Sequence, residues 1–174
     1  YENWAFLRPL IVPLHRRGYR VHVVAELGYN RSPIADGAAI VLDLLAARDL
    51  RDVVLVGHSK GGLIGKRAML GDTDGRISSL VTICTPFHGS SRARLLPLPS
   101  VTPLAPGHPD LVALGDPHPV NARITSLGTT FDEHVPEGSD LPGANNVTLD
   151  VPGHFLPIGH PKVLAELLAV LERP

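Results

Sequence analysis

Apolar positions along the chain alternate between short β-branched runs and stretches with helical spacing. The runs that predict strands cover residues 19–24, 53–56, 77–84, 122–129 and 146–151. Apolar residues that line one face of a helix predict helices over residues 4–17, 33–50, 60–70 and 161–171. Because strands alternate with helices, the pattern predicts an α/β fold with a mostly parallel sheet flanked by helices on both faces.

Residues 86–120 interrupt this alternation. The segment is rich in proline, and its apolar run at residues 95–99 has no period. A loop of this length in a compact domain is usually functional or disordered. We therefore expect a long loop, of the kind that forms a reduced lid or cap, within one domain that covers residues 1–174.

Composition excludes several classes of protein. The chain has 16 basic and 17 acidic residues and a net charge of −1, so no basic surface for nucleic acid is predicted. No apolar run reaches the roughly 18 residues of a transmembrane helix. The single cysteine, Cys84, lies in an apolar run and predicts a buried small side chain. Residues 1–4 do not have the features of a signal peptide, and we predict no compartment, secreted or cytoplasmic.

The most specific motif is Gly57-His58-Ser59-Lys60-Gly61, which matches G-x-S-x-G between a predicted strand and a predicted helix. This is the context of a nucleophile elbow, in which a strained serine exposes its hydroxyl. Gly57 and Gly61 are expected because a Cβ at either position would collide with the neighbouring strand or helix. The backbone N–H of Lys60 would then donate to an oxyanion. The alternative is a glycine-rich turn in which Ser59 only caps a helix.

A serine nucleophile needs a base, and the base needs a carboxylate that orients it. In a parallel sheet these groups are expected directly after later strands, because the strands' carboxyl ends meet at one edge. Asp132 follows the predicted strand 122–129 and is the predicted acid. His154 follows the predicted strand 146–151 and is the predicted base.

Other residues compete for these two roles. Glu133 is next to Asp132 but would point elsewhere, and the remaining candidate acids are Asp110, Asp116, Asp140 and Asp150. His160 is the alternative base, although its place before Pro161 predicts a helix cap. The remaining histidines lie too early in the chain, on the elbow or in predicted loops: His15, His22, His58, His88, His108, His118 and His134.

Three segments together resemble the small bacterial lipases and esterases of the α/β-hydrolase superfamily. They are residues 53–65 (VVLVGHSKGGLIG), 81–91 (VTICTPFHGSS) and 129–154, and the resemblance covers nearly the whole chain. It implies an α/β-hydrolase fold with Ser59 as nucleophile, Asp132 as acid and His154 as base, and no cofactor. It also implies a first strand and a His-Gly oxyanion loop before Trp4. We therefore expect the second oxyanion donor to lie outside residues 1–174.

We predict a serine ester hydrolase of the lipase or carboxylesterase type, which forms an acyl-enzyme on acylglycerol-like or short-chain esters. The same triad serves thioesterases, acyltransferases and amidases, and a non-catalytic domain that binds an acyl ligand or a partner is the alternative outside the enzymes. The expected partner is a small-molecule or lipid ester, with contact to a lipid surface left open and no oligomeric state predicted. No metal is predicted. A calcium ion is the alternative, on residues whose spacing matches no calcium loop: Asp132, Glu133, Glu137 and Asp140.

Overall fold

The sheet of this protein is parallel, and its strands follow chain order. The computed structural model describes residues 3–95, 98 and 100–172. The strands pair in the order β1-β2-β3-β4. Their bounds are β1 Val53–His58, β2 Ile77–Ile83, β3 Ile124–Thr129 and β4 Asn145–Leu149. The α-helices are α1 Arg8–Arg16, α2 Ile34–Ala47, α3 Lys60–Gly71, α4 Pro109–Gly115 and α5 Pro161–Leu171. Short 3₁₀ helices are η1 Trp4–Leu7, η2 Ala25–Leu27, η3 Ser91–Leu95, η4 Thr102–Leu104, η5 Pro119–Arg123 and η6 Leu156–Gly159.

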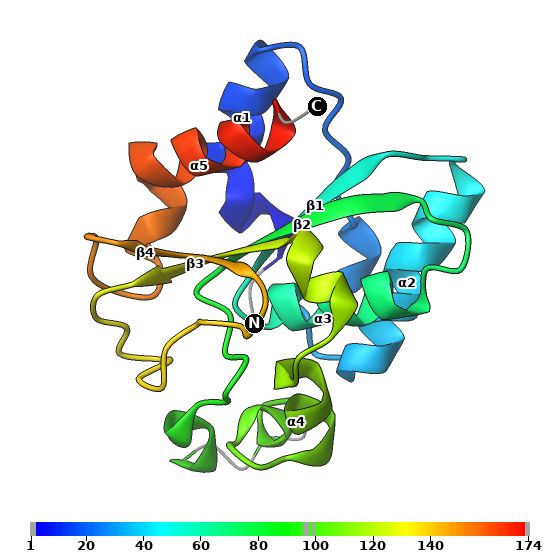
Figure 1. Cartoon of the computed structure of the whole chain (residues 1–174). Helices are drawn as coiled ribbons and strands as arrows, with labels where there is room; N and C mark the ends of the chain where they lie inside the picture. The colour runs from blue at the N-terminus through cyan, green and yellow to red at the C-terminus, as the bar shows by residue number, and fades with distance from the viewer. Residues whose placement is uncertain (1–2, 96–97, 99, 173–174) are drawn as a thin grey trace.

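Helices cover both faces of the sheet (Figure 1), which confirms the predicted α/β class. Because successive strand residues point to opposite faces, β2 contributes to two separate cores. Leu80 packs into the core beneath α2 and α3, whereas Val81 packs into the core beneath α1 and α5. The central strands β2 and β3 are largely buried, as expected for apolar strands between two helical layers.

The predicted helices agree closely with the observed ones. Residues 161–171 form α5, and residues 60–70 form α3 with one further residue. The helix predicted over residues 4–17 consists of η1 followed by α1, and Pro13 lies inside α1. In the part of the chain that is described, no helix is long and apolar enough to cross a bilayer.

The segment 86–120 contains more regular structure than a long loop. It includes η3, η4 and α4 and the beginning of η5, while residues 96, 97 and 99 lie outside the described part. Proline is compatible with the first turn of a helix, and Pro109 begins α4. Leu111 and Leu114, three positions apart, then pack into the core with Phe87. The proline-rich sequence therefore predicted a long loop where the chain forms several short helices.

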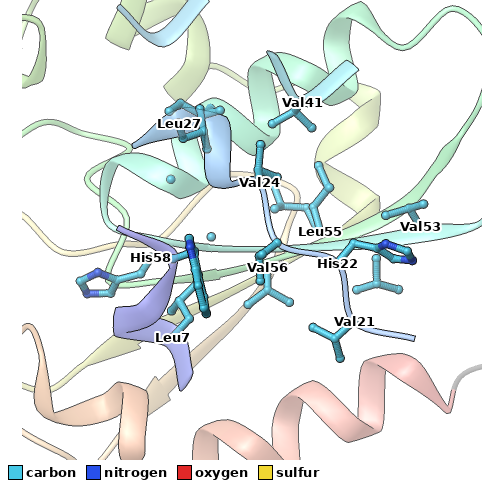
Figure 2. Close-up of a pocket in the computed structure, with 18 of the residues that line it drawn as sticks. Leu7, Val21, His22, Val24, Leu27, Val41, Val53, Leu55, Val56 and His58 are labelled. Atoms are coloured by element: carbon cyan, nitrogen blue, oxygen red, sulfur yellow. The ribbon is translucent and has the colours of Figure 1, made fainter. Parts of the chain in front are cut away.

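The strand predicted over residues 19–24 is wrong. The segment is not helical, and it joins no ladder in the described sheet. A cavity of about 580 Å³ separates it from β1, and Val21, Val24, Val53 and Leu55 line that cavity (Figure 2). β-branched residues favour an extended backbone, but a strand also needs a hydrogen-bonded neighbour.

A buried lysine joins α4 to the core. Lys66 lies in α3 with no exposed surface, and its Nζ donates to the carbonyl oxygens of Leu114 at 2.5 Å and Asp116 at 3.3 Å. The Nζ also lies 5.9 Å from the ring centre of Phe87. Burial lowers the pKa of Lys66 to about 8, and the charge of Asp116 opposes that shift. The hydrogen bonds of one ammonium thus hold the end of α4 against α3.

We expect Lys66 to make stability depend on pH in the alkaline range. The unfolded chain keeps the lysine proton up to about pH 10.5, whereas the folded chain releases it above about pH 8, so the unfolded state binds more protons between these values. The free energy of unfolding should therefore rise by on the order of 1–2 kcal/mol from about pH 8 to pH 10. Urea unfolding of the protein and of Lys66→Met, measured at both pH values, checks this. Equal pH dependence in the two proteins would contradict it.

Candidate active site

The turn between β1 and α3 gives Ser59 a positive φ. Its φ is 53° and its ψ is −124°. Three hydrogen bonds hold this backbone in place. The N–H of Ser59 donates to the Ile83 carbonyl at 2.8 Å, and its carbonyl accepts from Thr85 Oγ1 at 2.9 Å and from the Gly62 N–H at 3.1 Å. The strained conformation of the predicted elbow is therefore present.

Two glycines make the turn sterically possible. A Cβ on Gly57 would lie 2.5 Å from the Gly61 carbonyl carbon. A Cβ on Gly62 would overlap Thr85 Oγ1, which bonds to the Ser59 carbonyl. A Cβ on Gly61 would meet no described atom within 4 Å, so the steric reason expected for Gly61 is wrong. The second position that must lack a side chain is therefore Gly62, which directly follows Gly61.

The structure brings the predicted acid and base together. His154 Nδ1 lies 2.8 Å from Asp132 Oδ2, and both residues are buried. Asp132 Oδ1 accepts from the backbone N–H groups of His134 at 2.8 Å and Val135 at 2.9 Å. If His154 donates its Nδ1–H to Asp132, its Nε2 has no proton and is the ring nitrogen that can accept one.

Charge and burial act in opposite directions on this pair. Burial raises the pKa of Asp132, but the hydrogen bond and charge of His154, together with the two backbone N–H groups, hold that pKa below its usual value. Cys84 follows β2 at a φ of 51° and is fully buried, as predicted. Burial first, and the charge of Asp132 next, raise the pKa of the Cys84 thiol. Asp132 therefore carries the negative charge while its thiol neighbour stays neutral.

His58 links the elbow to the loop that carries His154. Its Nε2 lies 3.0 Å from the His154 carbonyl oxygen, and the two ring centres are 4.6 Å apart. His58 directly precedes Ser59, so this contact holds the two halves of the site together. Within the described part, the structure shows no hydrogen bond between the Ser59 hydroxyl and His154. Their direct contact stays a prediction.

Lys60 has a second role beyond its backbone N–H. That N–H begins α3, where the first amides of a helix have no intrahelical acceptor. The Lys60 Nζ donates to the carbonyl oxygens of Asn30 at 3.1 Å and Ser32 at 2.6 Å. Burial lowers the pKa of this amine. Lys60, the residue after Ser59, thus also holds the loop before α2.

The rival residues have other partners. His160 caps α5 and accepts from the Lys162 N–H at 3.2 Å, which confirms the predicted helix cap. Glu133 Oε1 lies 3.1 Å from His134 Nδ1 and accepts from the backbone N–H of His154 at 3.5 Å, so it contacts the loop of His154 and not its ring. Asp140 pairs with His88 at 3.1 Å.

The carboxylates of the calcium alternative do not converge. Among the described residues, the groups that lie close enough to share an ion are Asp132, Glu133 and His134 in one cluster, and His58, Cys84 and His154 in another. Glu137 instead accepts from the Ser91 N–H at 2.9 Å. The residues present therefore do not fit a calcium site built from Asp132, Glu133, Glu137 and Asp140.

Sequence reasoning missed three contributors to the site. His58 was expected only as part of the elbow motif, Thr85 only as part of the segment 81–91, and Cys84 only as a buried side chain. Their roles depend on contacts with Ser59, Asp132 and His154 across the sheet edge. Adjacency to the elbow was the available signal for His58, and the resemblance carried by residues 81–91 was the available signal for Cys84 and Thr85.

Part of this chain is similar in sequence to a curated protein. A protein of Variovorax paradoxus (strain S110), whose assigned name is that of a carbamate hydrolase, RutD, is 37% identical over 87 residues. The match covers 45% of this chain and 32% of that protein, so it spans about a third of the relative's length.

Solved structures with low sequence identity share the fold. The mature lipase BlEst2 of Bacillus licheniformis matches with a TM-score of 0.62 and 20% identity, over 80% of this chain and 75% of the other. A hydrolase from Oleispira antarctica matches with a TM-score of 0.65 and 16% identity, over 98% of this chain and 88% of the other. An extracellular α/β-hydrolase from a Paenibacillus species matches with a TM-score of 0.61 and 16% identity, over 96% and 93%.

A model of the protein family described as "alpha/beta hydrolase fold" matches residues 1–104, which is more than half of the chain. The matched region contains the elbow, and the parallel sheet with helices on both faces agrees with it. The chain belongs to the α/β-hydrolase fold family.

Proposed function

We propose that the protein is a serine hydrolase that cleaves carboxylic esters through an acyl-enzyme. The observation that carries this proposal is the buried 2.8 Å contact between His154 and Asp132. His58, which precedes Ser59 in the turn, contacts the His154 carbonyl oxygen and so connects this pair to the turn. A nucleophile, a base and an orienting carboxylate are the parts that acyl transfer needs. Family membership supports the same chemistry.

The reaction divides into two acyl transfers. The Ser59 Oγ attacks the ester carbonyl carbon, and its proton moves to His154 Nε2. His154 returns that proton to the leaving alcohol as the ester C–O bond breaks. Water then attacks the acyl-enzyme, giving its proton to His154 and releasing the acid and the Ser59 hydroxyl. Asp132 keeps Nδ1 protonated and stabilises the imidazolium that forms in each step.

The tetrahedral intermediates carry an oxyanion that needs hydrogen-bond donors. The Lys60 backbone N–H is one donor in the proposal, and such a donor contributes roughly 2.7–4 kcal/mol to transition-state stabilisation. The Lys60 side chain contributes by holding residues 30–32 beside the turn. The second donor is proposed to come from a loop after another strand.

Exposed apolar side chains lie near His154, whose ring also packs against His58 and His134, and they favour an apolar substrate. Phe155 packs edge-on against the His154 ring at 4.9 Å and against Phe6 at 5.5 Å. Phe6, Phe155 and Leu156 are all exposed. An acyl chain that contacts them would leave water, which supplies roughly 0.8 kcal/mol for each buried CH₂ group. This supports an acylglycerol-like or short-chain ester.

A carbamate is the second candidate substrate, favoured by the name of the Variovorax paradoxus relative. Ser59 would attack the carbamate carbonyl in the same way, with an amine or alcohol as leaving group. Initial rates on a p-nitrophenyl ester and on the matching p-nitrophenyl carbamate distinguish the two. Faster turnover of the carbamate would replace the ester in this proposal.

Loss of the nucleophile should abolish hydrolysis. We expect Ser59→Ala to lower kcat on p-nitrophenyl butyrate by roughly 10⁴ to 10⁶, because triad members act on the chemical step as one unit. A fluorophosphonate probe should label the original protein at Ser59 and leave the variant unlabelled, which mass spectrometry of the peptides reads independently of turnover. A variant that keeps most of its rate would show that Ser59 is not the nucleophile.

The two histidines near the end of the chain should differ. His154→Ala is expected to lower kcat about as far as Ser59→Ala, because both act in the same proton transfer. His160→Ala should leave kcat nearly unchanged and cost about 1 kcal/mol of stability, because it removes a helix cap. Kinetics and urea unfolding of both variants check this. The reverse ranking would assign the base to His160.

A further inference from the structure

A second carboxylate–imidazole pair lies against the Asp132–His154 pair. His134 is exposed, and its Nδ1 lies 3.1 Å from Glu133 Oε1. Its ring stacks on the His154 ring, with the ring centres 4.9 Å apart and the planes inclined by 28°. Each imidazole thus has its Nδ1 beside a carboxylate, but His154 is buried whereas His134 is open to the surface.

The main chain of His134 is fixed on both sides of the ring. Its N–H donates to Asp132 Oδ1 at 2.8 Å, and its carbonyl accepts from Ser90 Oγ at 2.5 Å. Glu133 Oε1 contacts both the His134 ring and the His154 N–H, so one carboxylate joins the two histidines. The His134 ring is therefore placed by three separate segments of the chain.

Glu133 determines which nitrogen of His134 can accept a hydrogen bond. A hydrogen bond from its own N–H, with further ones from the His154 N–H and from His134, lowers the pKa of Glu133, although burial opposes the shift. An ionised carboxylate accepts and cannot donate, so the hydrogen of neutral His134 lies on Nδ1. Its Nε2 is then an acceptor, and within the described part no hydrogen bond uses it.

The leaving alcohol of the proposed reaction must lie beside the His154 ring, because its oxygen receives a proton from His154 Nε2. In the described part, the rings of His58, His134 and Phe155 contact the His154 ring. His58 is buried, and its Nε2 contacts the His154 carbonyl oxygen. His134 and Phe155 are exposed, so the group attached to the leaving oxygen meets one polar and one apolar ring.

We propose that His134 is a specificity-determining residue, whose Nε2 accepts a hydrogen bond from a hydroxyl group on the alcohol part of the ester. The substrate class is then the carboxylic monoesters of vicinal diols and polyols. The two oxygens of a vicinal diol are close enough to contact two rings whose centres are 4.9 Å apart. This inference rests on the ester hydrolysis proposed above and names the alcohol that the same site takes.

The proposed contact requires a hydrogen-bond donor on the substrate. A hydroxyl donates to the His134 Nε2, whereas an ether oxygen only accepts and a methyl group does neither. The carbon atoms of the same alcohol pack against Phe155, which lies edge-on to His134 with the ring centres 5.1 Å apart. The site therefore distinguishes a diol ester from esters of the same length without the hydroxyl.

Three butyrate esters that differ only at the end of the alcohol test this. Hydrolysis of 2-hydroxyethyl, 2-methoxyethyl and n-propyl butyrate is followed in a pH-stat at about pH 8, where an ordinary imidazole is neutral. We expect kcat/KM for the hydroxyethyl ester to exceed that for the propyl ester roughly threefold to tenfold, the contribution of one hydrogen bond, and the methoxyethyl ester to resemble the propyl ester. His134→Phe keeps a ring stacked on His154, so it should bring the ratio to about one and leave the rate on the propyl ester nearly unchanged.

His88→Phe is the matched control variant. His88 is also exposed and lies 3.1 Å from a carboxylate, that of Asp140, but within the described part its ring does not contact the His154 ring. This variant should keep the ratio of the original protein. The oxyanion donors contact the carbonyl oxygen, which all three esters share, so they change each rate and not the ratio. Labelling by a fluorophosphonate shows that the site of each variant is formed, and His134→Leu, which also has no ring nitrogen, replaces His134→Phe if that variant is not labelled.

The outcomes separate this inference from the proposed function. A ratio near one in the original protein, an equal preference for the methoxyethyl ester, or a ratio that survives the loss of the His134 ring nitrogens overturns the role of His134 while ester hydrolysis stands. The role is also overturned if His88→Phe loses the ratio, or if the His134 variants lose all three rates in equal proportion, which indicates structural support alone. Hydrolysis of none of the three esters by the original protein overturns the proposed function and this inference with it.

Discussion

The positive φ of Ser59 is the constraint on which the candidate site depends. A residue with a side chain in such a conformation costs on the order of 1–3 kcal/mol, and the surroundings must offset that cost. Hydrogen bonds from β2, from Thr85 and from Gly62 hold it. Thr85 reaches the Ser59 carbonyl only because Gly62 has no side chain. The strain at Ser59 is therefore supported by the next strand and by the first turn of α3.

The parallel sheet gathers the rest of the site because every strand ends at the same edge. Ser59 follows β1, and Cys84 follows β2, while Asp132 and His154 follow β3 and β4. The two later loops are joined to each other by the Gly153 N–H, which donates to the Phe131 carbonyl at 2.7 Å at a φ of 93°. His58 then joins the base loop back to the elbow. Four segments far apart in the sequence thereby form one connected network.

Local signals predicted most of the elements and the contact between Asp132 and His154, and non-local contacts explain the misses. Helical spacing gave α5 its bounds, and the elbow motif with the strand-end rule identified Asp132 and His154 as a pair. The segment 19–24 has strand-like residues, yet whether it pairs depends on a neighbour that its own sequence does not specify. The steric demand at Gly62 comes from Thr85, 23 positions later, so the pattern around the elbow misassigned it to Gly61.

Because the strand order equals the chain order, the sheet can grow in the direction of synthesis. β1 is the first strand of the described sheet in chain order, and each later strand adds to the edge of the one before it. The elbow is therefore assembled early, since its supports from Ile83 and Thr85 arrive with β2. His154 emerges after β4, the last strand to join. A chain released from the ribosome before that point would have the strained Ser59 turn without His154, so the contact between Asp132 and His154 is the last part of the candidate site that the growing polypeptide gains.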